Sequence, residues 1–200
     1  MKLGRPRLHT CSGAVRDGSL WDDEPSGADH RVLDRCRGPV LDVGCGPARH
    51  TLALAEKGVP ALGLDITGPM LAVARPKGVA VLERSVFDRV PATGRWGTVL
   101  LLDGNIGIGG DPDLLLRRVR DLLAPGGLIL VELIELDASI GPHRARIEIN
   151  GQAGPWFGWV SVGADDIASL ATRAGGLAVR DIWGDEGRTF AEIEHDDAVD

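Results

Sequence analysis

The chain has 200 residues, a length that suits one α/β domain with a sizeable core. Hydrophobic residues make up 44% and charged residues 26%, the balance of a globular protein rather than a disordered or fibrous one. The formal net charge of −7 argues against nonspecific binding to a polyphosphate backbone, while 28 glycines, about twice the usual share, indicate many close backbone turns.

The cysteines and the termini predict a cytoplasmic protein. Cys11, Cys36 and Cys45 are odd in number and widely spaced, which favours neither a disulfide framework nor a metal site. No apolar run approaches the roughly 20 residues of a membrane span, and no apolar segment of signal-peptide type follows the basic N-terminus. We therefore expect no membrane anchor, no export and no bound metal.

In chain order, the sequence divides into an arm and one domain. Residues 1–19 lack periodicity, so we expect an N-terminal arm outside the core, followed by a single domain over 20–200. Apolar strands alternating with helices are typical of a parallel sheet covered on both faces. The predicted strands are 40–43, 60–65, 79–82, 98–102 and 128–133, and the predicted helices are 28–37, 48–57, one opened by Thr67-Gly68-Pro69 and one opened by Asp111-Pro112.

The stretch 137–163 interrupts this alternation. Apolar and charged residues alternate up to Ile149, and Asn150-Gly151 is a turn signal, so we expect an inserted β-hairpin. After a further helix, the last two strands, near 177–183 and 188–193, are joined by a link too short for a parallel crossover. The whole pattern predicts a doubly wound, mostly parallel α/β fold whose final strand runs antiparallel.

The end of the first strand carries the first candidate site. Gly44 and Gly46 allow a sharp turn and a close backbone approach to a ligand ahead of a helix N-terminus. A dinucleotide site would need a third glycine where the chain has Arg49. The carboxylate of Asp42 repels a phosphate and suits a cationic amino acid group.

Acidic residues also follow the next two strands. Asp65 lies 19 residues after Gly46, where an acid accepts hydrogen bonds from the two hydroxyls of an adenosine ribose. Phe87-Asp88 follows the third strand, and an apolar surface beside an acceptor suits adenine. For each acid alone, an ordinary turn or helix cap is the simpler alternative.

Together these residues resemble the class I S-adenosylmethionine-dependent methyltransferases. VLDVGCGPARH, over 40–50, is similar to that family's first motif, Asp65 to its ribose-binding acid, and 85–88 to its adenine-binding motif. Residues 111–132, ending in LLAPGGLILVE, are similar to its fourth helix and fifth strand. The resemblance covers about 40–193. It implies a seven-stranded sheet with an antiparallel last strand that binds S-adenosyl-L-methionine and releases S-adenosyl-L-homocysteine.

The resemblance and the strand ends together predict which residues bind the cofactor. Ala48 replaces the family's usual third glycine, and the signature of members that methylate DNA amino groups is missing after the fourth strand, so we expect no nucleic-acid partner. The predicted cofactor-binding residues are Asp42, Gly44, Cys45, Gly46, Asp65, Ile66, Met70, Phe87, Asp88 and Asp103.

The glycine-rich loop 103–110 would lie beside the transferable methyl. Asp103 or Asn105 could orient the cofactor or the nucleophile there, although a flexible loop is the alternative. The catalytic candidates are Asp103, Asn105 and His143, with Glu132 as a further possible base; none has the spacing of a dyad or triad.

The inserted hairpin carries the remaining candidates. Its aromatic residues could form the wall of a pocket for an apolar substrate, although aromatics more often pack a hairpin onto the body of a protein. The basic residues near them could bind a carboxylate, or they could form a solvated face. The substrate-binding candidates are Asn105, Arg144, Trp156 and Trp159.

The functional hypothesis is transfer of a methyl group from S-adenosyl-L-methionine to an O, N or C nucleophile of a small molecule. Two alternatives stay open: a noncatalytic S-adenosylmethionine-binding protein and an NAD(P)-dependent oxidoreductase. The attacked atom and the oligomeric state do not follow from the sequence.

Overall fold

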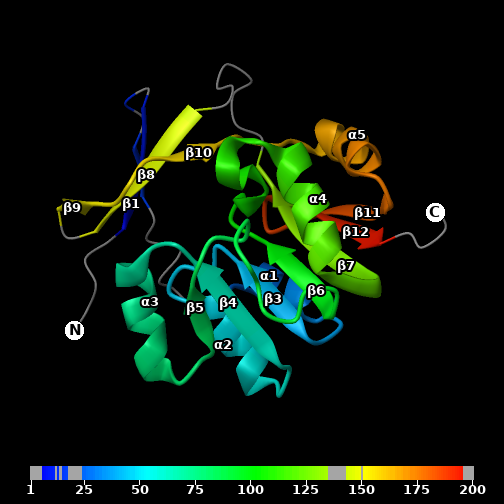
Figure 1. Cartoon of the computed structure of the whole chain (residues 1–200), viewed down its shortest axis with the longest axis horizontal. Helices are drawn as coiled ribbons and strands as arrows, with labels where there is room; N and C mark the ends of the chain where they lie inside the picture. The colour runs from blue at the N-terminus through cyan, green and yellow to red at the C-terminus, as the bar shows by residue number, and fades with distance from the viewer. Residues whose placement is uncertain are drawn as a thin grey trace.

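The computed structural model describes residues 6–11, 13, 15–17, 24–134, 143–149 and 151–195. Its main sheet contains β3 (Val40–Val43), β4 (Ala61–Asp65), β5 (Val81–Glu83), β6 (Trp96–Leu101), β7 (Leu123–Leu133), β11 (Leu177–Asp185) and β12 (Arg188–His195). The seven strands lie in the order β11-β12-β7-β6-β3-β4-β5 (Figure 1).

Strand directions in the main sheet confirm the predicted fold. Five strands, from β7 through β6, β3 and β4 to β5, are paired in parallel, whereas β12 pairs antiparallel with both β7 and β11. The strand predicted over 128–133 begins earlier, at Leu123, so Pro125-Gly126-Gly127 lie within β7, where its register against β6 shifts.

Helices cover both faces of the main sheet. The helices are α1 (Gly27–Leu33), α2 (Arg49–Glu56), α3 (Gly68–Ala74), α4 (Pro112–Leu122) and α5 (Ala164–Ala174). One apolar core joins α4 and α5 to the sheet, and a second joins α1 and α2 to the opposite face. The start of α4 follows directly from the sequence, because Asp111 accepts a hydrogen bond from the Leu114 backbone N–H at 2.9 Å and Pro112 occupies the first turn. Within the described residues no helix is long and apolar enough to cross a membrane.

A second sheet, called the small sheet below, lies beside the carboxyl ends of the central parallel strands (Figure 1). Its strands are β1 (Arg7–Thr10), β2 (Val15–Asp17), β8 (His143–Ile149), β9 (Gln152–Ala153) and β10 (Phe157–Trp159). The antiparallel pairing of β8 with β9 confirms the predicted hairpin insertion.

The sequence did not predict the two strands within the N-terminal arm. β1 pairs antiparallel with both β2 and β8, and Leu8 is only 5% exposed. In the pairing of β1 with β8, Leu8 lies opposite Ile147, which is far away in the chain, so no local pattern marks this segment as a strand. The boundary between arm and domain stays a prediction, but part of the arm contributes to the structure around the site.

Candidate active site

A cavity of about 380 Å³ lies at the carboxyl ends of β3, β4 and β6, and the small sheet covers it. This volume is within the usual range for small-molecule sites. Eight of the ten predicted cofactor-binding residues line the cavity: Gly44, Cys45, Gly46, Asp65, Ile66, Met70, Phe87 and Asp103.

The glycine turn after β3 has the backbone geometry that its sequence predicts. Gly44 and Gly46 adopt φ values of 73° and 54°, in the left-handed region that favours glycine. Asn105 fixes this turn, because its side-chain amide donates to the carbonyl oxygens of Val43 at 2.9 Å and Gly44 at 3.0 Å. A Cβ on Gly44 would lie 2.6 Å from that amide nitrogen, so the position requires glycine. Ala48 also has a positive φ, of 65°, which explains why a glycine is favourable there.

Asp65 joins two of the loops that surround the cavity. Its carboxylate accepts the backbone N–H of Gly46 at 2.8 Å and that of Thr67 at 2.7 Å. Burial raises the pKa of Asp65, while these two backbone donors oppose the rise. Asp65 lines the cavity, so a ligand there can contact it.

Asp42 and Asp88 are outside the cavity lining, contrary to the expectation that both contact a ligand. Asp42 is 1% exposed and accepts a hydrogen bond from the Thr51 hydroxyl at 2.8 Å, and burial raises its pKa. Its side chain points towards α2 rather than into the cavity. The backbone carbonyl of Asp88 accepts from Arg118, and the preceding residue, Phe87, faces the cavity instead.

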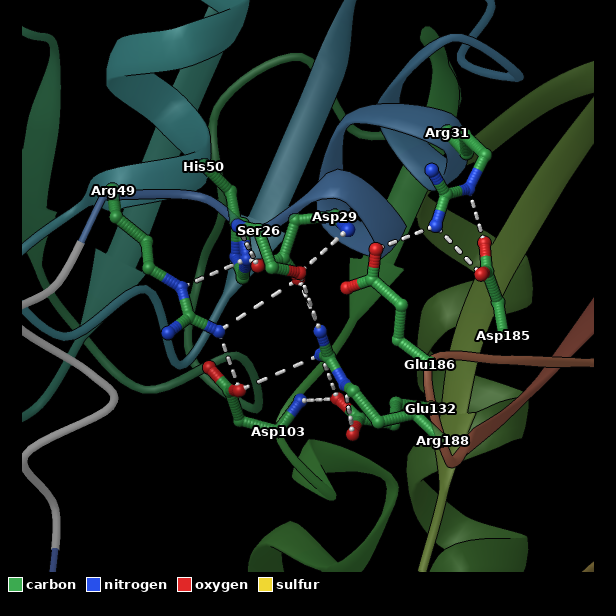
Figure 2. Close-up of polar contacts among 10 residues, drawn as sticks. All are labelled: Ser26, Asp29, Arg31, Arg49, His50, Asp103, Glu132, Asp185, Glu186 and Arg188. Carbon is green, nitrogen blue, oxygen red and sulfur yellow. Dashed lines mark hydrogen bonds and ion pairs between the residues drawn. The ribbon is translucent and has the colours of Figure 1, made fainter.

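A set of ionisable side chains, called the charge network below, borders the cavity on the side of β6 and β7 (Figure 2). Its centre is an ion pair between Arg49 and Asp103, with 2.7 Å between Nη2 and Oδ1. Both residues line the cavity. The charge network consists of Asp29, Arg49, His50, Asp103, Glu132 and Arg188.

Among the other members of the charge network, Glu132 also lines the cavity, whereas Asp29, His50 and Arg188 are not among the described lining residues. Arg188 lies 2.7 Å from Asp29 and makes a forked contact with Glu132 at 2.8 and 2.6 Å. Burial alone raises the pKa of Asp29, but hydrogen bonds from His50, Arg188 and the Ser26 backbone outweigh it and hold the pKa far below its ordinary value. The carboxylate of Asp29 therefore stays ionised at neutral pH.

The predicted catalytic candidates occupy different positions. Asp103 lines the cavity and is paired with Arg49, and Asn105 lines it while holding the glycine turn. The backbone of His143 lies in β8 opposite Trp159, and its side chain is outside the described part of the structure.

The small sheet provides the apolar part of the cavity wall. Phe157 and Trp159 line the cavity, with their rings 6.1 Å apart in an edge-to-face arrangement, and Leu8 and Ile147 lie beside them. Trp156 does not line the cavity; it is 37% exposed and stacks with Arg146.

Arg144 is the other substrate candidate that lies away from the cavity. Its side chain is exposed, and it is not among the described lining residues. Of the four substrate candidates, Asn105 and Trp159 therefore reach the cavity.

The glycine-rich loop packs closely against β10 and the residue that follows it. Most of it forms a 3₁₀ helix, η3 (Asn105–Gly110), in which Ile106 is fully buried. A Cβ on Gly107 would lie 1.8 Å from the carbonyl oxygen of Val160, and the Val160 N–H donates to the carbonyl of Gly107 at 3.2 Å. The glycines let the backbone that follows β10 pack directly on the loop.

Comparison with known proteins agrees with this architecture. Residues 40–127 match the sequence model of the family described as "Methyltransferase domain". Over these residues the chain is therefore similar in sequence to methyltransferases. Its fold is similar to that of an S-adenosylmethionine-dependent methyltransferase from Bacteroides fragilis, solved with S-adenosyl-L-homocysteine, with a TM-score of 0.80 and 24% identity over 96% of this chain and 88% of that one.

Two curated proteins are also similar to the chain in sequence. A trans-aconitate 2-methyltransferase from Paracidovorax citrulli is 28% identical over 79% of this chain, and a ubiquinone biosynthesis O-methyltransferase from Pseudomonas paraeruginosa is 31% identical over 57%. The aligned region spans 62% and 49% of the lengths of those two relatives.

Three residues that border or support the cavity were not predicted as site residues from the sequence: Arg49, Leu8 and Arg188. Arg49 was considered only as a departure from a dinucleotide motif, although it contributes a charge to the cavity wall. Leu8 and Arg188 belong to β1 and β12, near opposite ends of the chain, and no local pattern connects either to the glycine turn.

Proposed function

We propose that this protein is an S-adenosyl-L-methionine-dependent methyltransferase that acts on a small-molecule acceptor. The observation that carries the proposal is a single cavity that contains the Asp65 carboxylate, the Arg49–Asp103 ion pair and an apolar wall from the small sheet. These features match the three parts of the reacting system: an adenosine, an amino acid group and an acceptor. The match of residues 40–127 to the methyltransferase family model and the likeness in fold support the same conclusion.

The adenosine part of the cofactor fits the end of the cavity formed by β4 and β5. The carboxylate of Asp65 would accept hydrogen bonds from the two ribose hydroxyls. The adjacent surface of Ile66, Val86 and Phe87 is apolar and suits the flat face of adenine. Gly44 and Gly46 have no side chain to block the approach of the ligand to the backbone.

The amino acid part of the cofactor fits the Arg49–Asp103 pair. An α-amino acid carries an ammonium and a carboxylate on neighbouring atoms, so an acid and a guanidinium 2.7 Å apart present complementary charges. Asp103 would face the ammonium, and Arg49 would face the carboxylate. This assignment replaces Asp42, which the sequence favoured for the ammonium but which is buried away from the cavity.

The protein's contribution to the reaction would consist mainly of positioning and water exclusion. S-adenosyl-L-methionine supplies a methyl group already made electrophilic by the sulfonium. Holding two reactants in line can contribute roughly 7 to 11 kcal/mol of the barrier. Phe157 and Trp159 would place the acceptor, and the small sheet would keep water away from the reacting atoms.

Measuring the conversion of S-adenosyl-L-methionine to S-adenosyl-L-homocysteine in the presence of an acceptor tests this function. The assay would compare panels of phenols, amines and carboxylic acids as acceptors, with Trp159→Ala as a variant that alters the acceptor side. We expect turnover of at least one panel member and a lower rate for the variant. Binding of the cofactor without turnover across all three panels would instead favour a noncatalytic binding protein.

A further inference from the structure

The backbone of Asp103 adopts a conformation that side chains disfavour. Its φ is 56°, in the left-handed region, and Gly104 follows with φ of 78°. Asp and Asn tolerate this region better than most residues, but such a residue still depends on its surroundings to hold it there. The conformation places the Asp103 carboxylate against Arg49 at the cavity wall.

Glu132 holds this backbone from the neighbouring strand. Its Oε2 accepts the backbone N–H of Asp103 at 2.7 Å, and Glu132 is 7% exposed. A buried carboxylate needs a fixed counter-charge to keep such a position. That counter-charge is Arg188 on β12, whose Nε and Nη2 contact the two oxygens of Glu132 at 2.8 and 2.6 Å (Figure 2).

Arg188 is itself held by a second carboxylate. Its Nη1 donates to Asp29 at 2.7 Å, and Asp29 also accepts the backbone N–H of Ser26 in the capping box that begins α1. The planar guanidinium thus bridges α1 and β7, and a carboxylate on each side fixes the direction of its N–H groups. Arg188 is not among the described residues that line the cavity, but its Nη2 also lies 3.9 Å from Oδ1 of Asp103, so it supports Asp103 both through Glu132 and by its own charge (Figure 2).

We propose that Arg188 is a positioning residue for the cofactor site: by fixing Glu132, it holds Asp103 in the left-handed conformation that directs its carboxylate to Arg49 and the cavity. This inference rests on the proposed function, since it assigns Asp103 a contact with the cofactor. The alternative is that Arg188 only stabilises the packing of β12 on β7. The two possibilities differ in whether the effect of Arg188 on the cofactor depends on Asp103.

A double-mutant cycle with S-adenosyl-L-homocysteine as the probe separates them. Binding would be measured by calorimetry for wild type, Arg188→Met, Asp103→Asn and the double variant. Asparagine keeps the tolerance for a positive φ and removes the charge. The matched control is Arg180→Met, which removes another arginine of the last hairpin, 48% exposed and paired with Glu194 at 2.8 Å.

We expect Arg188→Met to weaken binding about tenfold in the wild-type background. In the Asp103→Asn background it should weaken binding less than about twofold, because the contact between the Asp103 carboxylate and the cofactor is then already absent. The control should change binding less than about twofold in both backgrounds. An equal loss in both backgrounds, or no loss in wild type, would overturn the inference.

Arg188→Lys and Glu132→Gln keep the test usable if Arg188→Met does not fold. Lysine preserves the charge but cannot make the forked contact, and glutamine cannot accept from both donors on two oxygens. Each should weaken binding in the wild-type background and not in the Asp103→Asn background. Wild-type protein that binds no S-adenosyl-L-homocysteine would defeat the proposed function and this inference together, whereas wild-type binding with an additive cycle defeats the inference alone.

Discussion

Replacing Asp65 with alanine removes one carboxylate that serves two purposes. In the protein alone it accepts the backbone N–H groups of Gly46 and Thr67 at 2.8 and 2.7 Å, which connects the glycine turn to the start of α3. In the proposed complex it also accepts the ribose hydroxyls. The substitution therefore affects both the free energy of unfolding and the affinity for S-adenosyl-L-homocysteine.

The structure sets the size of each effect. Hydrogen bonds to a charged group contribute about 1.5 to 3 kcal/mol each, but burial raises the pKa of Asp65 and offsets part of that gain. We expect the variant to lose about 2 kcal/mol of stability. Leaving the ribose hydroxyls unpaired should weaken binding by about 1 to 3 kcal/mol, or roughly 5- to 150-fold.

Calorimetric titration and thermal unfolding measure the two effects separately. Glu83→Ala is the matched control, because Glu83 pairs in register with Asp65 on β5, yet its side chain is 52% exposed and contacts Arg75 rather than the cavity. We expect the control to change affinity less than about twofold, in line with the small contribution of exposed ion pairs. If Asp65→Ala binds S-adenosyl-L-homocysteine as tightly as wild type does, the ribose does not lie at Asp65.

Three further predictions concern acidity and packing. Because burial raises the pKa of Asp65 above 3.8, wild-type affinity should fall on acidification at a higher pH than an ordinary aspartate would give, and titrations of Asp65→Asn should lack that step. Hydrogen bonds hold the pKa of Asp29 below 3.8, so its carboxylate stabilises the fold above that pH and this contribution is lost as the pH falls. Asp29→Asn should therefore be less stable than wild type at pH 7 and approach wild-type stability in acid. A difference in stability that stays constant with pH in denaturant titrations would contradict this. Gly107→Ala should destabilise the fold by about 2 kcal/mol or more, because its Cβ meets the carbonyl of Val160, whereas Gly184→Ala, with no atom nearer than 3.9 Å, should be tolerated; equal melting temperatures for the two would refute this.

The sequence predicted the parts of the site that form over short distances along the chain. Gly44 and Gly46 follow a strand and precede a helix, so their turn could be expected from local residues alone, and the structure has it. Asp65 likewise ends an apolar strand, and its place at the cavity follows from the shared edge of parallel strands. The confirmed doubly wound, mostly parallel fold of the main sheet was predicted from the same kind of local pattern, the alternation of strands and helices.

Side-chain direction at a strand end was harder to predict. Asp42 and Asp65 both end or nearly end a strand, but one is buried towards Thr51 and the other lines the cavity. A strand alternates its side chains between two faces, so a shift of one residue decides which face receives the carboxylate. Both predicted strands end where the structure ends them, at Val43 and Asp65, so the difference lies in the face that each carboxylate takes: Asp42 is buried against Thr51 and is not among the described lining residues.

Contacts between distant segments could not be predicted at all. Leu8 reaches the cavity because β1 pairs with β8, and Arg188 reaches Glu132 because β12 lies beside β7. Neither pairing has a local signature. The glycine-rich loop illustrates the same limit, because its glycines accommodate the backbone at Val160, which belongs to the inserted segment.

Competitive calorimetry on the wild-type protein tests the central claim, that the cavity is a site for S-adenosyl-L-methionine, most directly. S-adenosyl-L-homocysteine, NAD and NADP would be titrated separately, and sequential titrations would show whether any two compete. We predict roughly micromolar binding of S-adenosyl-L-homocysteine and no binding of either nicotinamide dinucleotide, because Asp42 and Arg49 depart from a dinucleotide site. Binding of NAD or NADP without binding of S-adenosyl-L-homocysteine would contradict the assignment.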